Sequence, residues 1–200
     1  MNNTKKKSPI SWVTTAYFAM GLPFVVLNMV TVLMFKGLEV DDKLITFWTS
    51  LILLPWTLKP LWSPFLELFR TKKFFVIVTQ LITGITFGLV AFALNLSHFF
   101  SISIALLAIV AFSGATHDIA CDGVYMSELS NEDQAKFIGW QGAFYNIAKI
   151  LATGGLVYLA GYFIELNADA GLLTANKRAW MIILLILSVT MILLGIYHLF

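Results

Sequence analysis

Six long apolar runs, separated by short polar links, constrain this 200-residue chain more than any other feature. Each run has about 20 residues or more, the length that an α-helix needs to cross the hydrocarbon core of a bilayer. We expect membrane-spanning helices at residues 11–35, 44–69, 74–94, 99–125, 137–164 and 180–200. Hydrophobic residues make up 59% of the chain, more than a soluble domain of this length could bury. The sequence therefore predicts an all-α, polytopic membrane helix bundle.

Lysine and arginine in the links set the expected orientation. Residues 1–10 form a basic amino terminus, and the apolar run after it is too long for the core of a cleaved signal peptide. Placing this terminus inside gives the inner side Lys5, Lys6, Lys7, Arg70, Lys72, Lys73 and Lys136, against Lys36, Lys43, Lys177 and Arg178 outside. The positive-inside rule favours this arrangement, so we expect both termini in the cytoplasm. The two longest links, 127–136 and 165–178, are expected to be polar loops.

Four ionisable residues fall inside the expected spans: Lys59, Asp118, Asp122 and Lys149. A charge in hydrocarbon is costly, so it needs an opposite charge, a proton or a water-filled cavity beside it. At a rise of about 1.5 Å per residue, both lysines fall within roughly 5 Å of the midplane and Asp118 lies about 10 Å toward the inner face. Because a lysine stem reaches along the helix, a Lys59–Asp118 pair between neighbouring helices is geometrically feasible.

Two interpretations of these residues stay open. Lys59, Asp118 and Lys149 either line a polar, proton-responsive cavity or form static pairs that fix the helix register. Asp122, one turn after Asp118 on the same helix face, either joins that cavity or reaches interfacial water. His117 either relays protons or packs away from Asp118, because consecutive helical residues point about 100° apart.

The sequence lacks the signatures of common enzyme and metal sites. It has no HExxH, no GxSxG and no phosphate-binding loop, and the single Cys121 excludes an internal disulfide and a cysteine-based metal cluster. Intramembrane aspartyl enzymes place two aspartates on different helices, whereas Asp118 and Asp122 share one. The net charge of +2 is too small to indicate nucleic acid. We therefore expect no enzyme activity, no cofactor and no metal ion.

Two short runs resemble those of a known transporter family. The second expected span ends in LKPLWSP (residues 58–64), and the fourth ends in HDIACDGVY (residues 117–125). They are similar to the LK-x-LW-[SA]-P and QDIA-x-D-[AG]-[WY] runs of muropeptide permeases of the AmpG type and of the related acetyl-coenzyme A transporters. With its six spans, the chain resembles the amino-terminal half of a major facilitator superfamily transporter over residues 10–200.

The family pattern is changed at three places. His117 replaces the Gln that precedes the first Asp, and Asn146 stands where the permeases tend to carry Arg, with Lys149 one turn further on. The loop between the second and third spans departs from the superfamily pattern GxxxDRxGRR. The resemblance implies a gating role for this loop, carried here by Glu67, Arg70, Lys72 and Lys73.

The resemblance implies half of a twelve-helix secondary transporter, with its six spans arranged as a 3+3 inverted repeat. It implies a pathway for solute and protons lined by Asp118, Asp122, Lys59, Lys149, His117 and Asn146. The implied partners are the lipid bilayer, a proton, a small organic and muropeptide-like anionic solute, and a carboxyl-terminal half in the same or another chain. The family's usual location is the bacterial inner membrane. The alternative is a six-span assembly or scaffold protein that transports nothing, or a non-functional truncated half.

Overall fold

The computed structural model describes residues 8–69 and 71–199, with Glu67 and Phe69 described by their backbone alone. Within these ranges the chain is mostly helical and contains no strand. Among the described residues, six helical segments are long and apolar enough to cross a membrane: Pro9–Gly37, Asp42–Leu61, Lys72–Ala93, Phe99–Glu128, Asn131–Leu166 and Leu172–Leu199. The prediction of an all-α bundle with six membrane-length helices is confirmed.

The first crossing widens in its middle. It consists of α1 (Pro9–Val25), the π-helical segment η1 (Val26–Val30) and α2 (Thr31–Gly37). Pro23 lies inside α1 and has no N–H to donate, which disturbs the regular ladder of backbone hydrogen bonds. Directly after it, the N–H of Val26 donates to the carbonyls of Leu22 and Pro23. The wide turn follows the proline, as expected for a helix that must accommodate it.

The second crossing is broken into four short pieces. They are α3 (Asp42–Ile52), α4 (Leu54–Leu58), the 3₁₀ segment η2 (Lys59–Leu61) and α5 (Ser63–Phe69). Pro55, Pro60 and Pro64 each remove a backbone donor from this stretch, so a continuous α-helix cannot form. The expected span 44–69 is therefore a discontinuous helix, with its most irregular part at Lys59.

The third crossing packs between the fourth and the sixth. α6 (Lys72–Ala93) lies between α7 (Phe99–Glu128) and α10 (Leu172–Leu199). Gly84 and Gly88 of the GxxxG sequence face α10: a Cβ on Gly84 would lie 2.9 Å from the carbonyl oxygen of Ser188. The glycines thus let the two backbones approach closely. A single large apolar cluster runs through these helices and the first crossing, and it includes Phe35, Phe87 and Leu187.

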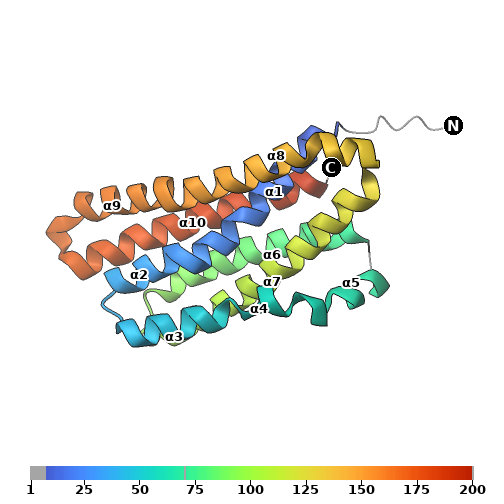
Figure 1. Cartoon of the computed structure of the whole chain (residues 1–200). Helices are drawn as coiled ribbons and strands as arrows, with labels where there is room; N and C mark the ends of the chain where they lie inside the picture. Colours follow the sequence, from blue (N-terminus) through green and yellow to red (C-terminus); the bar gives the residue numbers. More distant parts are fainter. Residues whose placement is uncertain (1–7, 70, 200) are drawn as a thin grey trace.

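The fifth crossing lies at the edge of the bundle. It consists of α8 (Asn131–Ile150), the π-helical segment η3 (Leu151–Leu156) and α9 (Val157–Leu166). α8 packs against α1, and η3 contacts η1, so the two π-helical segments lie beside each other. Figure 1 shows α8 and α9 running along the outside of the bundle, next to α1 and α10.

Two of the expected loops are mostly helix. The prediction of a loop over 127–136 is wrong, because α7 continues to Glu128 and α8 begins at Asn131, where the Ser130 side chain accepts from the N–H of Asp133. The prediction of a loop over 165–178 is also wrong, because α10 begins at Leu172 after a short turn. Polar helix ends extend beyond the apolar runs, since helices satisfy their own backbone hydrogen bonds in water as well as in lipid.

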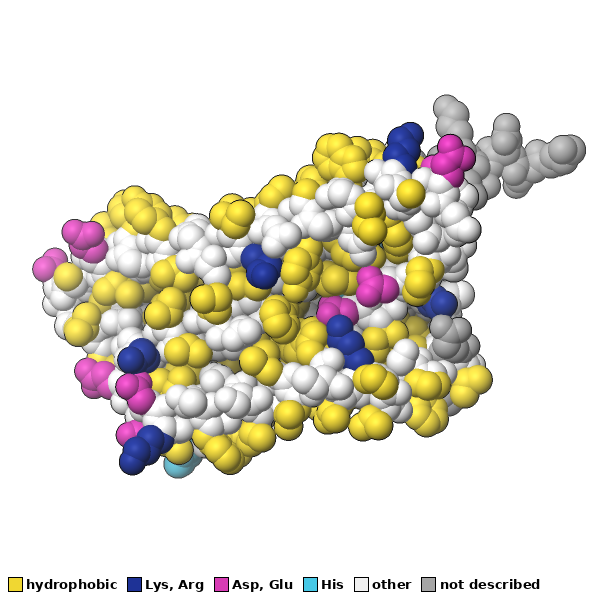
Figure 2. Space-filling model, viewed as in Figure 1, with side chains coloured by type: hydrophobic (Ala, Val, Ile, Leu, Met, Phe, Trp, Pro, Cys, Tyr) yellow, Lys and Arg dark blue, Asp and Glu magenta, His cyan; other side chains and the backbone are white. Residues whose placement is uncertain are grey.

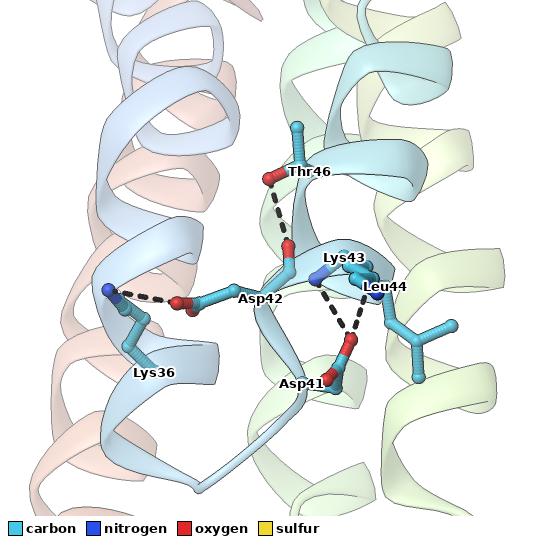
Figure 3. A network of polar contacts seen from close by, with 6 residues as sticks. All are labelled: Lys36, Asp41, Asp42, Lys43, Leu44 and Thr46. Atoms are coloured by element: carbon cyan, nitrogen blue, oxygen red, sulfur yellow. Dashed lines mark hydrogen bonds and ion pairs between the residues drawn. The ribbon is translucent and has the colours of Figure 1, made fainter.

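A tight polar turn joins the first and second crossings (Figure 3). The Asp41 carboxylate caps α3 by accepting from the backbone N–H groups of Lys43 and Leu44, at 2.9 and 3.3 Å. Lys36 pairs with Asp42 across the turn, with its Nζ 3.4 Å from Oδ2, and both side chains are well exposed. This turn lies at the end of the bundle opposite to the start of α1 and the end of α10 (Figure 1).

Candidate functional site

An ion pair joins the second and fourth crossings. The Nζ of Lys59 lies 2.7 Å from Oδ2 of Asp118, and the Trp56 indole Nε1 donates to the same oxygen at 2.9 Å. The other oxygen, Oδ1, is buried and has no hydrogen-bond partner among the described residues. The carboxylate thus has both of its donors on one oxygen. The pair expected from the depths of the two residues is present.

The break in the second crossing positions both donors. Trp56 lies on α4 and Lys59 opens η2, three residues later, so both side chains lie on one side of the chain. Irregular backbone at membrane depth is tolerated where it is buried in protein or lines a cavity, and broken helices of this kind form binding sites in transporters. The side chains are 27% exposed for Lys59 and 12% exposed for Asp118, so the carboxylate is buried and the lysine reaches it from the margin of the bundle.

Gly114 provides the space for the Trp56 ring. A Cβ at Gly114 would lie 2.9 Å from Cζ2 of Trp56 and 3.3 Å from Cβ of Pro23. On its other side the indole meets Phe24 edge to face, with ring centroids 5.3 Å apart. The indole is therefore held between α7 and α1 with its N–H directed at Asp118. The absence of a side chain at Gly114 thus leaves room for a tryptophan ring.

Asp122 lies one turn after Asp118 and is exposed. The hydroxyl of the buried Tyr17 on α1 donates to its Oδ1 at 2.7 Å. A shallow cavity of about 310 Å³ opens here between α1, α7 and α8, lined by Tyr17, Asp122, Gln141 and Tyr145 among others. The second carboxylate thus borders an open cavity instead of sharing the Lys59 pair.

Polar and charged groups continue from this cavity along α8. Asn146 is exposed and donates through Nδ2 to the carbonyl of Gly142, and Lys149 lies with its Nζ 5.6 Å from the centre of the Tyr145 ring. Both contacts are within α8, so neither side chain is brought to Asp118. In the part of the chain that the structure describes, Lys149 forms no ion pair. Figure 2 shows acidic and basic side chains gathered in the middle of this face, between α8 and α4, among hydrophobic side chains.

His117 belongs to a separate buried network. Gln80 on α6 donates through Nε2 to Nε2 of His117 at 3.0 Å, and its Oε1 accepts from Nδ1 of His198 at 2.8 Å. His198 Nε2 in turn lies 2.9 Å from the Thr15 hydroxyl. The network connects α7, α6, α10 and α1, and Gln80 is fully buried within it. Although His117 adjoins Asp118 in sequence, the two side chains contact different helices.

The residues with an expected gating role are only partly described. Glu67 belongs to α5 and is described by its backbone alone, and Arg70 lies outside the described residues. Lys72 and Lys73 begin α6, at the end of the bundle where α1 starts. These two lysines line a larger cavity that is separate from the Asp118 site.

Several site residues have only a weak signal in the sequence. Trp56 stands three positions before Lys59, which is helical spacing, and could have been assigned to the same face. Tyr17, Gln80 and His198 lie in apolar runs far from their partners in sequence, and no local pattern identifies them. No group of three or more His, Cys, Asp or Glu side chains in the described ranges is arranged to hold a metal ion.

No protein-family model, curated protein or solved structure matches this chain.

Proposed function

We propose that this chain is one half of a proton-coupled secondary transporter for a small organic solute. The observation that carries the proposal is the Lys59–Asp118 ion pair at the break of a membrane-length helix. Ionisable groups at such depth face a bundle interior or a water-filled cavity, and they mark substrate and ion pathways. The Oδ1 atom of Asp118, which has no partner among the described residues, is the atom that takes up the proton in this proposal.

The polar face supports a partner beside the chain. Asp122 and Gln141 line one cavity, Asn146 and Lys149 follow on α8, and all four side chains are partly or fully exposed. A membrane-spanning surface with these groups is costly against acyl chains, because their charges and hydrogen-bonding groups would lose water without gaining partners. A second six-helix half, enclosing a wet cavity with this one, removes that cost. We infer a twelve-helix assembly whose halves are each a 3+3 inverted repeat.

The resemblance of two sequence runs to muropeptide permeases agrees with this assignment. In the proposed transporter Lys59 and Lys149 are cavity cations, which favour an anionic solute, and both termini are cytoplasmic in a bacterial inner membrane. Lys149 bears on the rival interpretation, a scaffold whose charges fix helix register. A register-fixing charge needs a partner, whereas Lys149 forms no ion pair within the described ranges.

Uptake into proteoliposomes tests the proposal. The natural protein that contains this chain is reconstituted and given a panel of labelled organic anions, including muropeptide-like compounds, with and without an inward proton gradient. We expect gradient-driven accumulation of at least one solute, and its loss in Asp118→Asn. Asp42→Asn is the matched control. It changes a carboxylate at the exposed turn between the first and second crossings, away from the ion pair, and is expected to keep full uptake.

Two results contradict the proposal. Normal gradient-driven uptake by Asp118→Asn removes this carboxylate from proton coupling. Absence of any solute flux in the unaltered protein, together with an unchanged phenotype of Lys149→Met, favours the scaffold interpretation.

A further inference from the structure

A second, larger cavity lies away from the Asp118 site. It has a volume of about 920 Å³ and is enclosed by the ends of the helices at one end of the bundle. α1, α6 and α8 begin there, and α7 and α10 end there. A volume of this size lies within the range of sites that hold a small organic ligand.

The cavity has an apolar wall. Trp12, Ala16, Val76, Val124 and Phe137 line it and pack together in one apolar cluster. Cys121, the single cysteine of the sequence, lies in the same wall and is almost fully buried. A ligand without apolar surface would gain no binding free energy from these side chains, so the wall favours a ligand with an apolar part.

Basic and acidic side chains also line the cavity. Lys72, Lys73 and Lys136 outnumber two carboxylates, Glu128 and Asp133, and the side chains of Lys73 and Lys136 are exposed. One of the two carboxylates is engaged within its own helix, because Oδ2 of Asp133 accepts from the Ser130 hydroxyl at 3.1 Å. α6 and α8 begin here, and α7 and α10 end here, so their dipoles offset one another and the lysines supply the positive charge.

Gly123 guides one of these lysines toward the cavity. A Cβ at this position would lie 2.6 Å from Cδ of Lys72, so the lysine stem lies directly over the glycine on α7. The stem is packed against Gly123, and Lys72 is one of the residues that line the cavity. A positive charge at the cavity is therefore positioned by the packing of two helices.

We propose that this cavity binds the phosphate headgroup of an anionic phospholipid, with the lipid's glycerol and upper acyl region against the apolar wall. Basic pockets between membrane helices at one membrane surface are the type of site that takes such headgroups. The lysines contact the phosphate, and the wall formed by Trp12, Val76, Val124 and Phe137 contacts the apolar part. The site shares only the α1 and α7 helices with the Asp118 ion pair and does not depend on the proposed transport activity.

Native mass spectrometry of the purified chain in detergent tests this site. The protein is titrated separately with phosphatidylglycerol, phosphatidylcholine and water-soluble glycerol phosphate. We expect one molecule of phosphatidylglycerol to bind at least tenfold more tightly than phosphatidylcholine, and no binding of glycerol phosphate at the same concentration. Lys73→Gln with Lys136→Gln weakens this binding roughly 30-fold, since each lysine near an anionic group contributes about fivefold.

Two further variants locate the lipid. Val124→Trp places a bulky ring on the apolar wall without changing the charge of the cavity, and we expect it to abolish the preference for phosphatidylglycerol. Lys36→Gln with Lys43→Gln removes two lysines from the opposite end of the bundle and leaves binding unchanged. Thermal unfolding confirms that each variant is folded before it is titrated.

Three results overturn the proposal. Equal affinity for the two lipids shows that the headgroup charge is not recognised. Binding of glycerol phosphate as tight as that of the lipid shows that the site takes a soluble anion. Unchanged phosphatidylglycerol affinity in Val124→Trp and in the Lys73/Lys136 variant places the lipid elsewhere on the protein.

Discussion

Lys59 and Asp118 form their ion pair, 2.7 Å from Nζ to Oδ2, at the residue where the second crossing leaves α-helical geometry. The pair is not fully enclosed by protein, because 27% of the Lys59 side-chain surface is exposed. The geometry combines two properties that are each costly in a bilayer, a broken backbone and a charged pair, at one position. Removing either partner therefore has a measurable effect on the stability of the isolated chain.

Lys59→Met is expected to lower the free energy of unfolding by about 3 kcal/mol, because it leaves the Asp118 carboxylate buried with Trp56 as its remaining donor. The double variant Lys59→Met with Asp118→Leu is expected to recover most of this loss, since no unpaired charge remains. Equilibrium unfolding in mixed detergent micelles measures all four species of the cycle. Additive effects of the two substitutions would show that the pair has no energetic coupling.

Trp56→Phe keeps an aromatic ring against Gly114 but removes the N–H that donates to Asp118. A hydrogen bond to a charged group contributes about 2 kcal/mol, and we expect a loss of that size in the unfolding free energy. Trp48→Phe, in α3 of the same crossing, is the control, because its side chain is 38% exposed. Equal losses in the two variants would indicate that ring size and not the hydrogen bond is responsible.

Gln80→Met removes the amide that joins His117 and His198 while keeping the length of the side chain. Each of two buried ring nitrogens then loses a partner, at about 1–3 kcal/mol for each one. We expect a fall in the thermal midpoint that is clearly larger than that of Gln141→Met on the exposed polar face. If both variants melt at the same temperature, the bridging amide does not stabilise the bundle.

Gly84→Ala is expected to destabilise the chain by about 1–3 kcal/mol, because the added Cβ would meet the Ser188 carbonyl and the Ile192 backbone nitrogen, at 2.9 and 3.0 Å. α6 and α10 must separate to admit it. Gly139→Ala on α8 has no atom within 4 Å of the added Cβ and is expected to gain up to about 1 kcal/mol from higher helix propensity. The unfolding free energies of both variants are measured in the same detergent. A Gly84→Ala variant that is more stable than the unaltered chain would contradict the close packing of α6 against α10.

The apolar runs were sufficient to predict the number and type of the crossings, because a bilayer requires about 20 apolar residues in each helix. They could not predict helix ends such as Asn131 and Leu172, where polar turns continue an apolar helix outside the hydrocarbon. The break at Lys59 has a signal in Pro55, Pro60 and Pro64. Which residues of this segment adopt α-helical and which adopt 3₁₀ geometry depends on contacts with neighbouring helices, and a local sequence pattern does not contain these contacts.

The ion pair could be predicted, whereas the hydrogen-bond partners of Asp122 and His117 could not. Lys59 and Asp118 are conspicuous because charges are rare in apolar runs, and their depths follow from helix geometry. Tyr17 and Gln80 are uncharged polar residues, which do not stand out in an apolar run. Their partners, Asp122 and His117, lie 105 and 37 positions away in the sequence. Which of the neighbouring helices they face is decided by tertiary packing. The separation of His117 from Asp118 follows the same rule, since adjacent residues of a helix face different neighbours.

The two π-helical segments, which lie against each other in the first and fifth crossings, also fix the rotational phase of the helices they interrupt. A π turn accommodates an extra residue, so loss of one residue from Val26–Val30 would restore regular α pitch. The two halves of the crossing would then keep their relative orientation, because the deleted residue is the one that the wide turn had absorbed. Tyr17 would still point toward Asp122, whereas deletion of a residue from the regular part of α1 after Tyr17 would rotate the preceding turns by about 100°. The wide turn is therefore the stretch of this crossing that can lose one residue without re-aiming the side chains on either side of it.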